Sequence, residues 1–174
     1  DRSKFSSILD ELGIMQPRWS KLESMESAKS FANEIGYPVL VRPSYVLSGS
    51  AMQVANDENE LEEYLNAAAD LSPEYPVVIS KFLTGAKEVE IDAVSDGKNV
   101  FIGAILEHVE EAGVHSGDAT ISIPTIMITE DVKEKIRDYT RKIAMELNIK
   151  GPFNIQYLVK NGNVYVIECN LRAS

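Results

Sequence analysis

Apolar residues along this chain recur with two different periods, which separate helices from strands. Spacing of three and four residues places apolar side chains on one face of a helix, and it predicts helices over residues 3–12, 25–35, 58–69 and 130–147. Ser24, Asp57 and Thr129 precede the last three of these helices, where an N-cap side chain is expected. Gly13 and Gly36 follow the first two, where a helix commonly ends.

Alternation of apolar and polar residues marks the strands. The alternating stretches are residues 38–44, 51–55, 77–83, two strands within 87–109 joined at Asp96-Gly97, and a hairpin over 151–170. Helices and mostly antiparallel strands follow one another in irregular order, which predicts an α+β fold.

The hairpin carries the most informative polar residues. A three-residue loop at residues 161–163, with glycine where positive φ is needed, would pair residue 160 with 164, 156 with 168 and 154 with 170. One face would then hold Asn154, Gln156, Glu168 and Asn170. The opposite, core-facing side would hold Phe153, Ile155, Tyr157, Val159, Tyr165, Ile167, Cys169 and Leu171. A two-residue turn would mix the two faces.

This polar face offers a cation only oxygen ligands, one carboxylate and several amide carbonyls. Such donors suit a hard ion such as Mg²⁺, which keeps several waters and shares nucleotide phosphates. The hairpin therefore indicates a site for a metal and ATP. The alternative is a hairpin with one ordinary solvated face.

Composition narrows the classes of function. The chain has 174 residues, 44% hydrophobic content and a formal net charge of −10. That charge argues against a nucleic-acid partner, because phosphate backbones are bound by basic stripes and none is present. Cys169 is the single cysteine, so no internal disulfide forms. No apolar run reaches the length of a membrane span. Because the chain begins without Met and stops just beyond the proposed ligands, we expect it to be a piece of a longer protein.

Several positions outside the hairpin have groups that suit a nucleotide. Arg42 ends a strand and precedes a proline that fixes its backbone, so its guanidinium suits phosphate oxygens, although alone it could be a surface cation. The small residues 47–50 could close over phosphates or form a simple turn. Lys81 could lie beside a nucleotide or extend along the surface.

The segment 107–120, EHVEEAGVHSGDAT, concentrates acids, imidazoles and glycines and is too polar for a regular element. His115 lies between two glycines that would let a ligand approach closely, whereas His108 has apolar flanks and is expected to be structural. Glu88, Glu90 and Asp92 share one strand face, which is expected to be solvated.

Together these segments closely resemble one known family. VRPSYVLSGSAM, EHVEEAGVHSGDAT, GPFNIQYLVK and VIECNLRAS, with GYPVLVRPSYVL, PVVISKF and KEVEIDAV in the same order, resemble the large subunit of carbamoyl phosphate synthetase across essentially the whole chain. RPSYVL, the pair Ala51-Met52 and GVHSGDA are similar to the ATP-grasp domain of its carboxy-terminal half, which phosphorylates carbamate.

The resemblance implies an ATP-grasp fold with nucleotide bound between two α+β lobes, residues 1–83 with the small lobe and phosphate flap, and residues 84–174 with the metal-binding hairpin. It assigns ATP phosphates to Arg42, the flap to Ser48 and Gly49, the adenine segment to Lys81 and Leu83, the ribose to Glu88, and the loop beside the nucleotide to Gly113, Val114, His115 and Ser116. It assigns Mg²⁺ or Mn²⁺ to Gln156, Glu168 and Asn170, and the transferred phosphoryl group to Arg172.

The implied reaction converts carbamate and ATP into carbamoyl phosphate and ADP, with ammonia or glutamine and bicarbonate as overall substrates of the parent enzyme. Catalysis would come from positioning and charge neutralisation by metal, Arg42 and Arg172. The implied partners are the other domains of the synthetase and a glutaminase domain or subunit, in pyrimidine or arginine biosynthesis, in the cytoplasm or the mitochondrion. The alternatives are another ATP-grasp ligase such as a biotin carboxylase, or a nucleotide-binding module that is inactive alone.

Overall fold

The computed structural model describes residues 2–43, 52–71, 77–112 and 119–173. The chain divides into two compact units, one formed by residues 1–7 and 17–83 and the other by residues 8–16 and 84–174. Compared with the expected division, residues 8–16 belong to the second unit. There, Val166 N donates to Met15 O at 2.9 Å, which adds this segment to the edge of the second sheet. The assignment of the units to named lobes stays a prediction.

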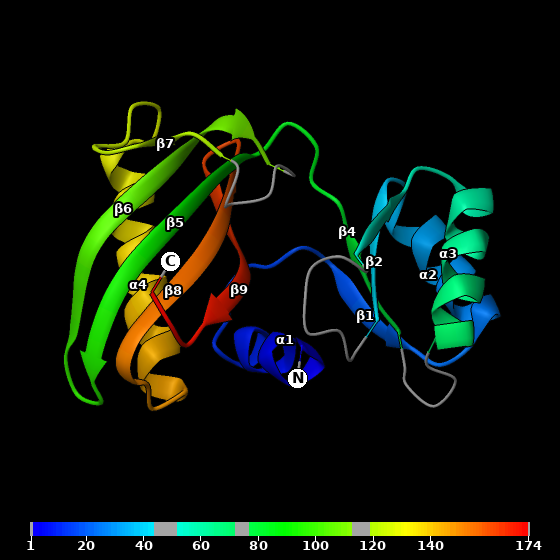
Figure 1. Cartoon of the computed structure of the whole chain (residues 1–174), viewed down its shortest axis with the longest axis horizontal. Coiled ribbons are helices and arrows are strands. Elements are labelled where there is room, and N and C mark those ends of the chain that lie inside the picture. Colours follow the sequence, from blue (N-terminus) through cyan, green and yellow to red (C-terminus); the bar gives the residue numbers. More distant parts are fainter. Residues whose placement is uncertain (1, 44–51, 72–76, 113–118, 174) are drawn as a thin grey trace. The chain divides into compact units, whose positions relative to one another are not determined.

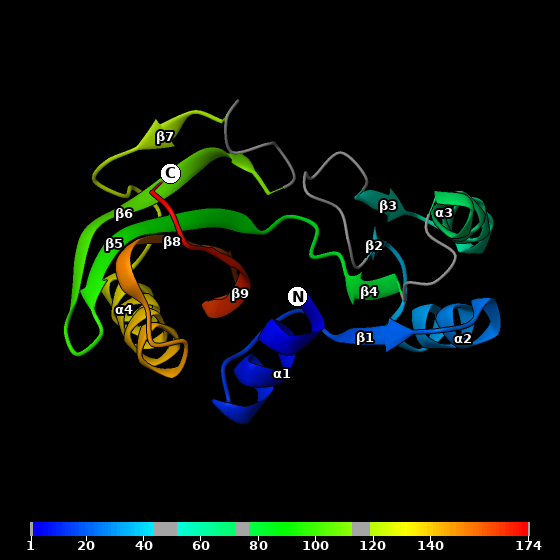
Figure 2. The ribbon, with the colours of Figure 1, turned by 60° about the horizontal axis from the view of Figure 1, so that its bottom comes forward.

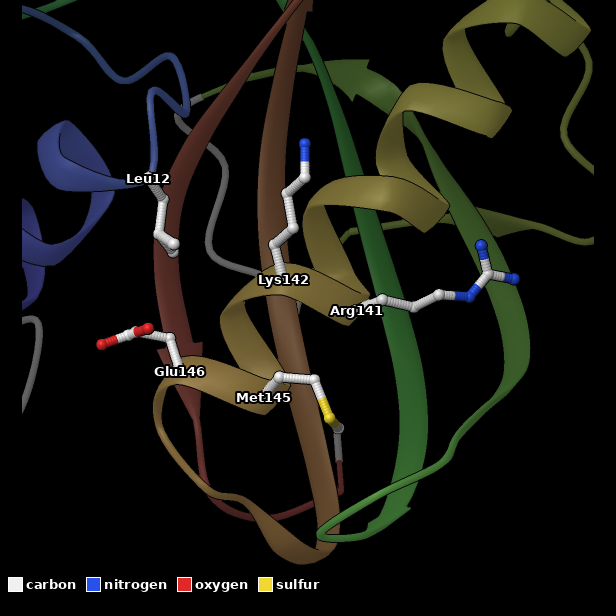
Figure 3. A pocket seen from close by; sticks show the side chains of 5 residues that line it. All are labelled: Leu12, Arg141, Lys142, Met145 and Glu146. Carbon is white, nitrogen blue, oxygen red and sulfur yellow. The ribbon is translucent and has the colours of Figure 1, made fainter.

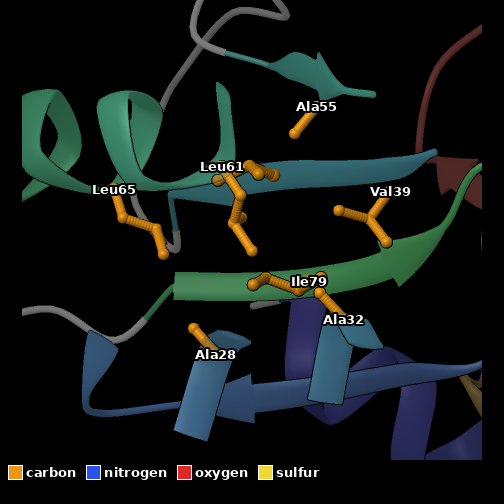
Figure 4. Close-up of a cluster of buried hydrophobic side chains, with 8 residues drawn as sticks. Ala28, Ala32, Val39, Ala55, Leu61, Leu65 and Ile79 are labelled. Atoms are coloured by element: carbon orange, nitrogen blue, oxygen red, sulfur yellow. The ribbon is translucent and has the colours of Figure 1, made fainter. Parts of the chain in front are cut away.

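The first unit is a small antiparallel sheet with two helices. Its strands lie in the order β1 (Trp19–Leu22), β4 (Val77–Lys81), β2 (Val39–Pro43) and β3 (Gln53–Ala55), and its helices are α2 (Met25–Ile35) and α3 (Glu58–Leu71). Figure 4 shows the core of this unit, in which small residues of α2 and larger ones of α3 meet the strand residue Ile79. Burying a side chain such as Leu61 or Ile79 contributes about 1.5–3 kcal/mol.

The predicted helix starts were confirmed for α2 and α3. Ser24 Oγ accepts from Ser27 N at 3.2 Å, and Asp57 Oδ1 accepts from the first-turn amides of Asn59 and Glu60 at 2.9 and 3.0 Å. Thr129 differs, because its side chain makes no capping hydrogen bond and only its backbone oxygen accepts, from Lys133 N at 3.0 Å. Thr129 is thus the N-cap residue of α4, as predicted, but it makes no capping hydrogen bond through its side chain.

The second unit is a five-stranded antiparallel sheet with one long helix against it (Figures 1 and 2). Its strands lie in the order β7 (Ile121–Ser122), β6 (Val100–Glu111), β5 (Lys87–Asp96), β8 (Lys150–Lys160) and β9 (Asn163–Asn170), and the helix is α4 (Glu130–Glu146). Helix α1 (Arg2–Glu11) begins in the residues of the first unit and ends in those of the second.

Helix α4 covers the apolar face of this sheet. Buried residues of α4 such as Ile136 and Ile143 supply the helix side of the core. Tyr157 of β8 meets Thr140 of α4 through hydroxyl oxygens 2.8 Å apart. The sheet contributes Val89, Ile91, Ala93, Phe153, Ile155, Val164 and Val166, all buried. With α4 on this side, the polar residues of the central strands lie on the opposite face.

Strands β1 and β7 were not predicted, and strand β6 is longer than expected. Residues 19–22, WSKL, lack a clean alternation, and β7 has only two residues, so neither gives a periodic signal. Strand β6 continues to Glu111, into the stretch expected to be irregular, and Ala112 N donates to Ala86 O at 3.0 Å. Pairing with β5 stabilises this polar stretch as a strand, a tertiary effect that local polarity does not reveal.

Candidate functional site

The predicted polar row of the hairpin is present in the second unit. Strands β8 and β9 are antiparallel, with Gln156 opposite Glu168 and Asn154 opposite Asn170. Asn170 Nδ2 donates to Glu168 Oε1 at 3.0 Å, so this amide and carboxylate lie within reach of one small ion. The amide and carboxylate oxygens of this row are the donors that Mg²⁺ and Mn²⁺ accept, so these residues fit such an ion.

The turn that produces this register differs from the predicted one. Lys160 pairs with Asn163, so the loop has two residues, Asn161 and Gly162, both with positive φ, 52° and 76°. These angles match a type I′ hairpin turn, for which Asn-Gly is the preferred sequence. The prediction of a three-residue loop was therefore wrong.

A β-bulge corrects for the shorter turn. The register shifts between Gln156 and Tyr157, because Tyr157 pairs with Val166 while Gln156 pairs with Glu168, and Ile167 is the extra residue. Without the bulge, a two-residue turn would mix the polar and apolar faces. With it, Glu168 returns to the polar face.

The bulge also changes which residues of β9 face the core. Val164 and Val166 are fully buried, whereas Tyr165 is only half-buried and lies opposite Leu158. The predicted core position of Tyr165 was thus wrong, because the actual turn shifts the first half of β9 by one residue, whereas Ile167 is the half-buried residue of the bulge. Cys169 lies opposite Ile155, and burial, followed by the nearby charge of Glu168, raises the pKa of its thiol to about 12.

The acidic row on β5 is buried rather than solvated. The exposed fractions are 7% for Glu88 and 3% for Glu90, and Asp92 is half-buried. Strand β5 lies between β6 and β8, with Glu90 opposite Gln156 and Asp92 opposite Asn154. The expectation of a solvated face was wrong, because the sequence does not show that β5 occupies the centre of the sheet.

Two buried side chains bind the carboxylate of Glu90. His108 Nε2 lies 2.5 Å from Glu90 Oε1, and Asn154 Nδ2 donates to Glu90 Oε2 at 2.9 Å. Both His108 and Asn154 are 1% exposed. One ligand atom from each of Glu88, Glu90 and His108 lies within 4.8 Å of the others. The predicted ribose residue Glu88 therefore belongs to a buried polar cluster that continues the row of the hairpin.

Sequence reasoning missed Glu90 and Asn154 as members of this cluster and treated His108 as structural. The available signal was the alternation Glu88-Val89-Glu90-Ile91-Asp92, which puts three acids on one strand face. Only the pairing of β5 with β8 shows that these acids meet the amides of the hairpin, and that pairing joins strands far apart in the sequence.

The predicted nucleotide residues of the first unit have defined places of their own. Arg42 lies on β2 opposite Val78 and is half-buried. Lys81 Nζ donates to Gly36 O and Tyr37 O, each at 2.8 Å, so its ammonium group caps the carbonyls that follow α2. Leu83, half-buried, follows β4 as the last residue of this unit.

Of the remaining predicted site residues, the structure describes Arg172. Arg172 is exposed just beyond β9, where its Nη1 donates to Ala173 O at 2.9 Å. Ser48, Gly49, Gly113, Val114, His115 and Ser116 lie outside the described residues.

A shallow pocket lies away from this polar row. Figure 3 shows it beside the C-terminal half of α4, lined by Leu12, Arg141, Lys142, Met145 and Glu146. None of these residues belongs to the predicted site. In the part of the chain that the structure describes, no helix is long and apolar enough to cross a membrane.

Solved structures show which fold this is. A biotin carboxylase complex with β,γ-ATP from Campylobacter jejuni superposes with a TM-score of 0.87 at 23% identity, covering 100% of this chain and 40% of that one. An ADP complex of N5-carboxyaminoimidazole synthetase from Staphylococcus aureus gives a TM-score of 0.83 at 18% identity, covering 100% of this chain and 45% of that one. The fold is ATP-grasp, as the sequence predicted.

Sequence comparison shows the family. A carbamoyl phosphate synthase large chain from Sulfurisphaera tokodaii is 57% identical over 174 residues, and one from Saccharolobus islandicus is 58% identical over the same length. The match covers 100% of this chain and 16% of each relative, so the chain spans about a sixth of their length. The family model for the carbamoyl-phosphate synthase L chain, ATP binding domain, matches residues 1–174. The chain therefore belongs to the ATP-binding domain family of the carbamoyl-phosphate synthase large chain.

Proposed function

We propose that this chain binds ATP with a divalent ion and, as part of a longer synthase, transfers the γ-phosphoryl group to carbamate. The observation that carries the proposal is the hairpin register, which places Gln156 opposite Glu168 and Asn154 opposite Asn170 on one polar face. Family membership over the whole chain supports the same conclusion. Gln156, Glu168 and Asn170 would hold Mg²⁺ or Mn²⁺, which would neutralise phosphate charge.

The protein itself forms no covalent bond in this reaction. A carbamate oxygen forms a bond to the γ-phosphorus as the bond from that phosphorus to ADP breaks, giving carbamoyl phosphate and ADP. Arg42 and Arg172 would bind the phosphate charge, and Lys81, Leu83 and Glu88 would position the nucleoside. The loop residues Ser48, Gly49 and 113–116 would complete the nucleotide contacts. No nucleophilic side chain is needed.

The proposal also covers the longer enzyme to which this chain would belong. Because the matched relatives are about six times longer, the remaining domains would supply the earlier chemistry and deliver carbamate. A glutaminase domain or subunit would provide ammonia, and the parent enzyme would serve pyrimidine or arginine synthesis in the cytoplasm or the mitochondrion. The isolated chain would bind nucleotide without sustained turnover.

The test replaces one carboxylate. Glu168→Gln removes the negative charge from the hairpin row while keeping its shape, and we expect Mg-ATP affinity to fall at least about tenfold, since one direct charge contact to a metal is lost. Calorimetric titration of the chain with Mg-ATP measures this, and ADP release by the full-length synthase with the same change measures phosphoryl transfer.

Glu146→Gln is the matched control. It removes the same charge from an exposed position on α4, the helix on the other face of the sheet, and should leave Mg-ATP affinity unchanged. Equal affinity of Glu168→Gln and the unaltered chain would refute the proposed metal site. Binding of ATP that is identical with and without divalent ion would refute it as well.

A further inference from the structure

Asn154 lies between two carboxylates of the neighbouring strand. Its Nδ2 donates to Glu90 Oε2 at 2.9 Å, to Ile91 O at 3.1 Å and to Asp92 Oδ1 at 3.3 Å. Glu90 and Asp92 are two residues apart on the same face of β5, so their charges repel. One buried amide group thus donates to both of these acids.

The carboxylate of Glu90 is bound at both oxygens. Asn154 occupies Oε2, and His108 lies 2.5 Å from Oε1. All three side chains are almost completely buried. A carboxylate bound at both oxygens in this way must break these hydrogen bonds before it can coordinate a cation, and breaking buried hydrogen bonds is unfavourable.

Glu90 is nevertheless close enough to matter to the proposed metal site. It lies opposite Gln156, which lies opposite Glu168, so these residues form one row across three adjacent strands. With neighbouring strands about 4.8 Å apart, the backbones of Glu90 and Glu168 are separated by about 10 Å. Two glutamate side chains that lean toward Gln156 from either side could share one ion.

We propose that Asn154 is a positioning residue that keeps Glu90 out of the coordination of the divalent ion, leaving Glu168 as the carboxylate of the hairpin that holds it. This inference rests on the proposed function. Its consequence concerns affinity, because the strength of ion binding increases with the number of carboxylate ligands. With Glu90 withheld, the ion binds weakly by itself and arrives with the nucleotide.

The first experiment releases Glu90. Asn154→Leu keeps the number and branching of the side-chain heavy atoms but donates no hydrogen bond, so Glu90 Oε2 loses its partner. We expect Mn²⁺ or Mg²⁺ alone, without nucleotide, to bind the chain at least about threefold more tightly, since a second carboxylate becomes available. Isothermal titration of the metal chloride measures this, and Glu90→Gln in the Asn154→Leu background should restore the original affinity.

The second experiment does not depend on the folding of Asn154→Leu. Glu90→Gln alone keeps oxygen and nitrogen atoms for Asn154 and His108, and it should weaken metal binding clearly less than Glu168→Gln does, because Glu90 acts on the ion only through its charge and is not a ligand. A loss of metal affinity in Glu90→Gln as large as that in Glu168→Gln would overturn the inference. So would a folded Asn154→Leu variant, judged by circular dichroism, whose metal affinity is unchanged or weaker.

A parallel titration separates this inference from the function on which it rests. If Glu168→Gln leaves metal and Mg-ATP binding unchanged, the hairpin site itself is refuted. If Glu168→Gln weakens binding and Asn154→Leu fails to strengthen metal binding, only the role assigned to Asn154 is refuted.

Discussion

Tyr157 and Thr140 connect strand β8 to helix α4 through one buried hydrogen bond. Thr140 Oγ1 donates to Ile136 O at 2.7 Å, so the Tyr157 hydroxyl, 2.8 Å away, donates to Thr140. Burial raises the pKa of the Tyr157 phenol, which keeps its proton and remains a donor. The core of the second unit thus contains a polar pair that is fully satisfied.

We therefore expect Tyr157→Phe to lower the free energy of unfolding by about 1 kcal/mol, the usual net value of one hydrogen bond. Thr140 would still donate to Ile136, so no buried donor is left unpaired. Urea denaturation of Tyr157→Phe, Thr140→Val and the double variant measures the coupling between the two residues. A coupling energy of zero would contradict this account.

Cys169 leads to a pH-dependent prediction. Burial and the charge of Glu168 raise its thiol pKa to about 12, whereas an unfolded cysteine titrates near 8.5. Above about pH 8.5 the unfolded chain releases this proton and the folded chain keeps it, so this group lowers stability as pH rises towards 12. At lower pH both states hold the proton and the effect is absent.

Two measurements check the behaviour of Cys169. At pH 8 a thiol reagent should modify the folded chain at least about a hundredfold more slowly than the chain in urea, because the thiolate is the reacting form. Between pH 9 and 11, Cys169→Ala should lose less unfolding free energy than the unaltered chain. Equal reaction rates in the folded and unfolded states would show that the thiol is neither buried nor shifted.

At the level of secondary structure, the N-cap residues of α2 and α4 allow a matched pair of substitutions. Ser24 accepts a hydrogen bond from the first turn of α2, while the side chain of Thr129 at α4 makes none. Ser24→Ala should lower the free energy of unfolding by about 1 kcal/mol, and Thr129→Ala should lower it by less than half as much. Thermal or urea unfolding of the two variants checks this, and equal losses would contradict the assignment of the caps.

These elements also show what a sequence can and cannot predict. Helices α2 and α3 were predicted because apolar periodicity and a capping side chain, Ser24 or Asp57, occur together in adjacent residues. The hairpin was predicted for the same local reason, since Asn161-Gly162 favours a turn. The bulge at Ile167 was not, because it depends on burying Val164 and Val166 against residues elsewhere in the fold.

In the candidate site too, local groupings could be predicted and long-range ones could not. Gln156, Glu168 and Asn170 face one another across a single hairpin, so counting residues from the turn was enough to group them, even with the wrong loop length. Grouping Glu90 with Asn154 requires knowing that β5 pairs with β8, more than fifty residues later in the chain. Long-range strand pairing has no local signature, and the burial of the acids could not be read from their polarity.

At the scale of the whole chain, the formal net charge of −10 disfavours the binding of an anionic nucleotide. Four of the acidic residues behind this charge, Glu88, Glu90, Asp92 and Glu168, lie on the polar face of the second sheet. The negative charges of these acids would repel ATP unless a divalent ion accompanies it. The ion is therefore expected to be required for nucleotide binding and not only for phosphoryl transfer.

Melting experiments test this requirement directly. A ligand that binds only the folded state at a hundred times its dissociation constant stabilises by about 2.7 kcal/mol, and for a chain of this size the apparent melting temperature should rise by roughly 5–10 °C. We expect that rise with Mg-ATP, little change with ATP and EDTA, and at most about half of the rise for Glu168→Gln with Mg-ATP, since a tenfold loss of affinity leaves about 1.4 kcal/mol. Glu146→Gln should respond to Mg-ATP like the unaltered chain. An equal rise with ATP in EDTA would mean that basic side chains and backbone amides alone overcome the acidic face, and the ion would then have no part in holding the nucleotide.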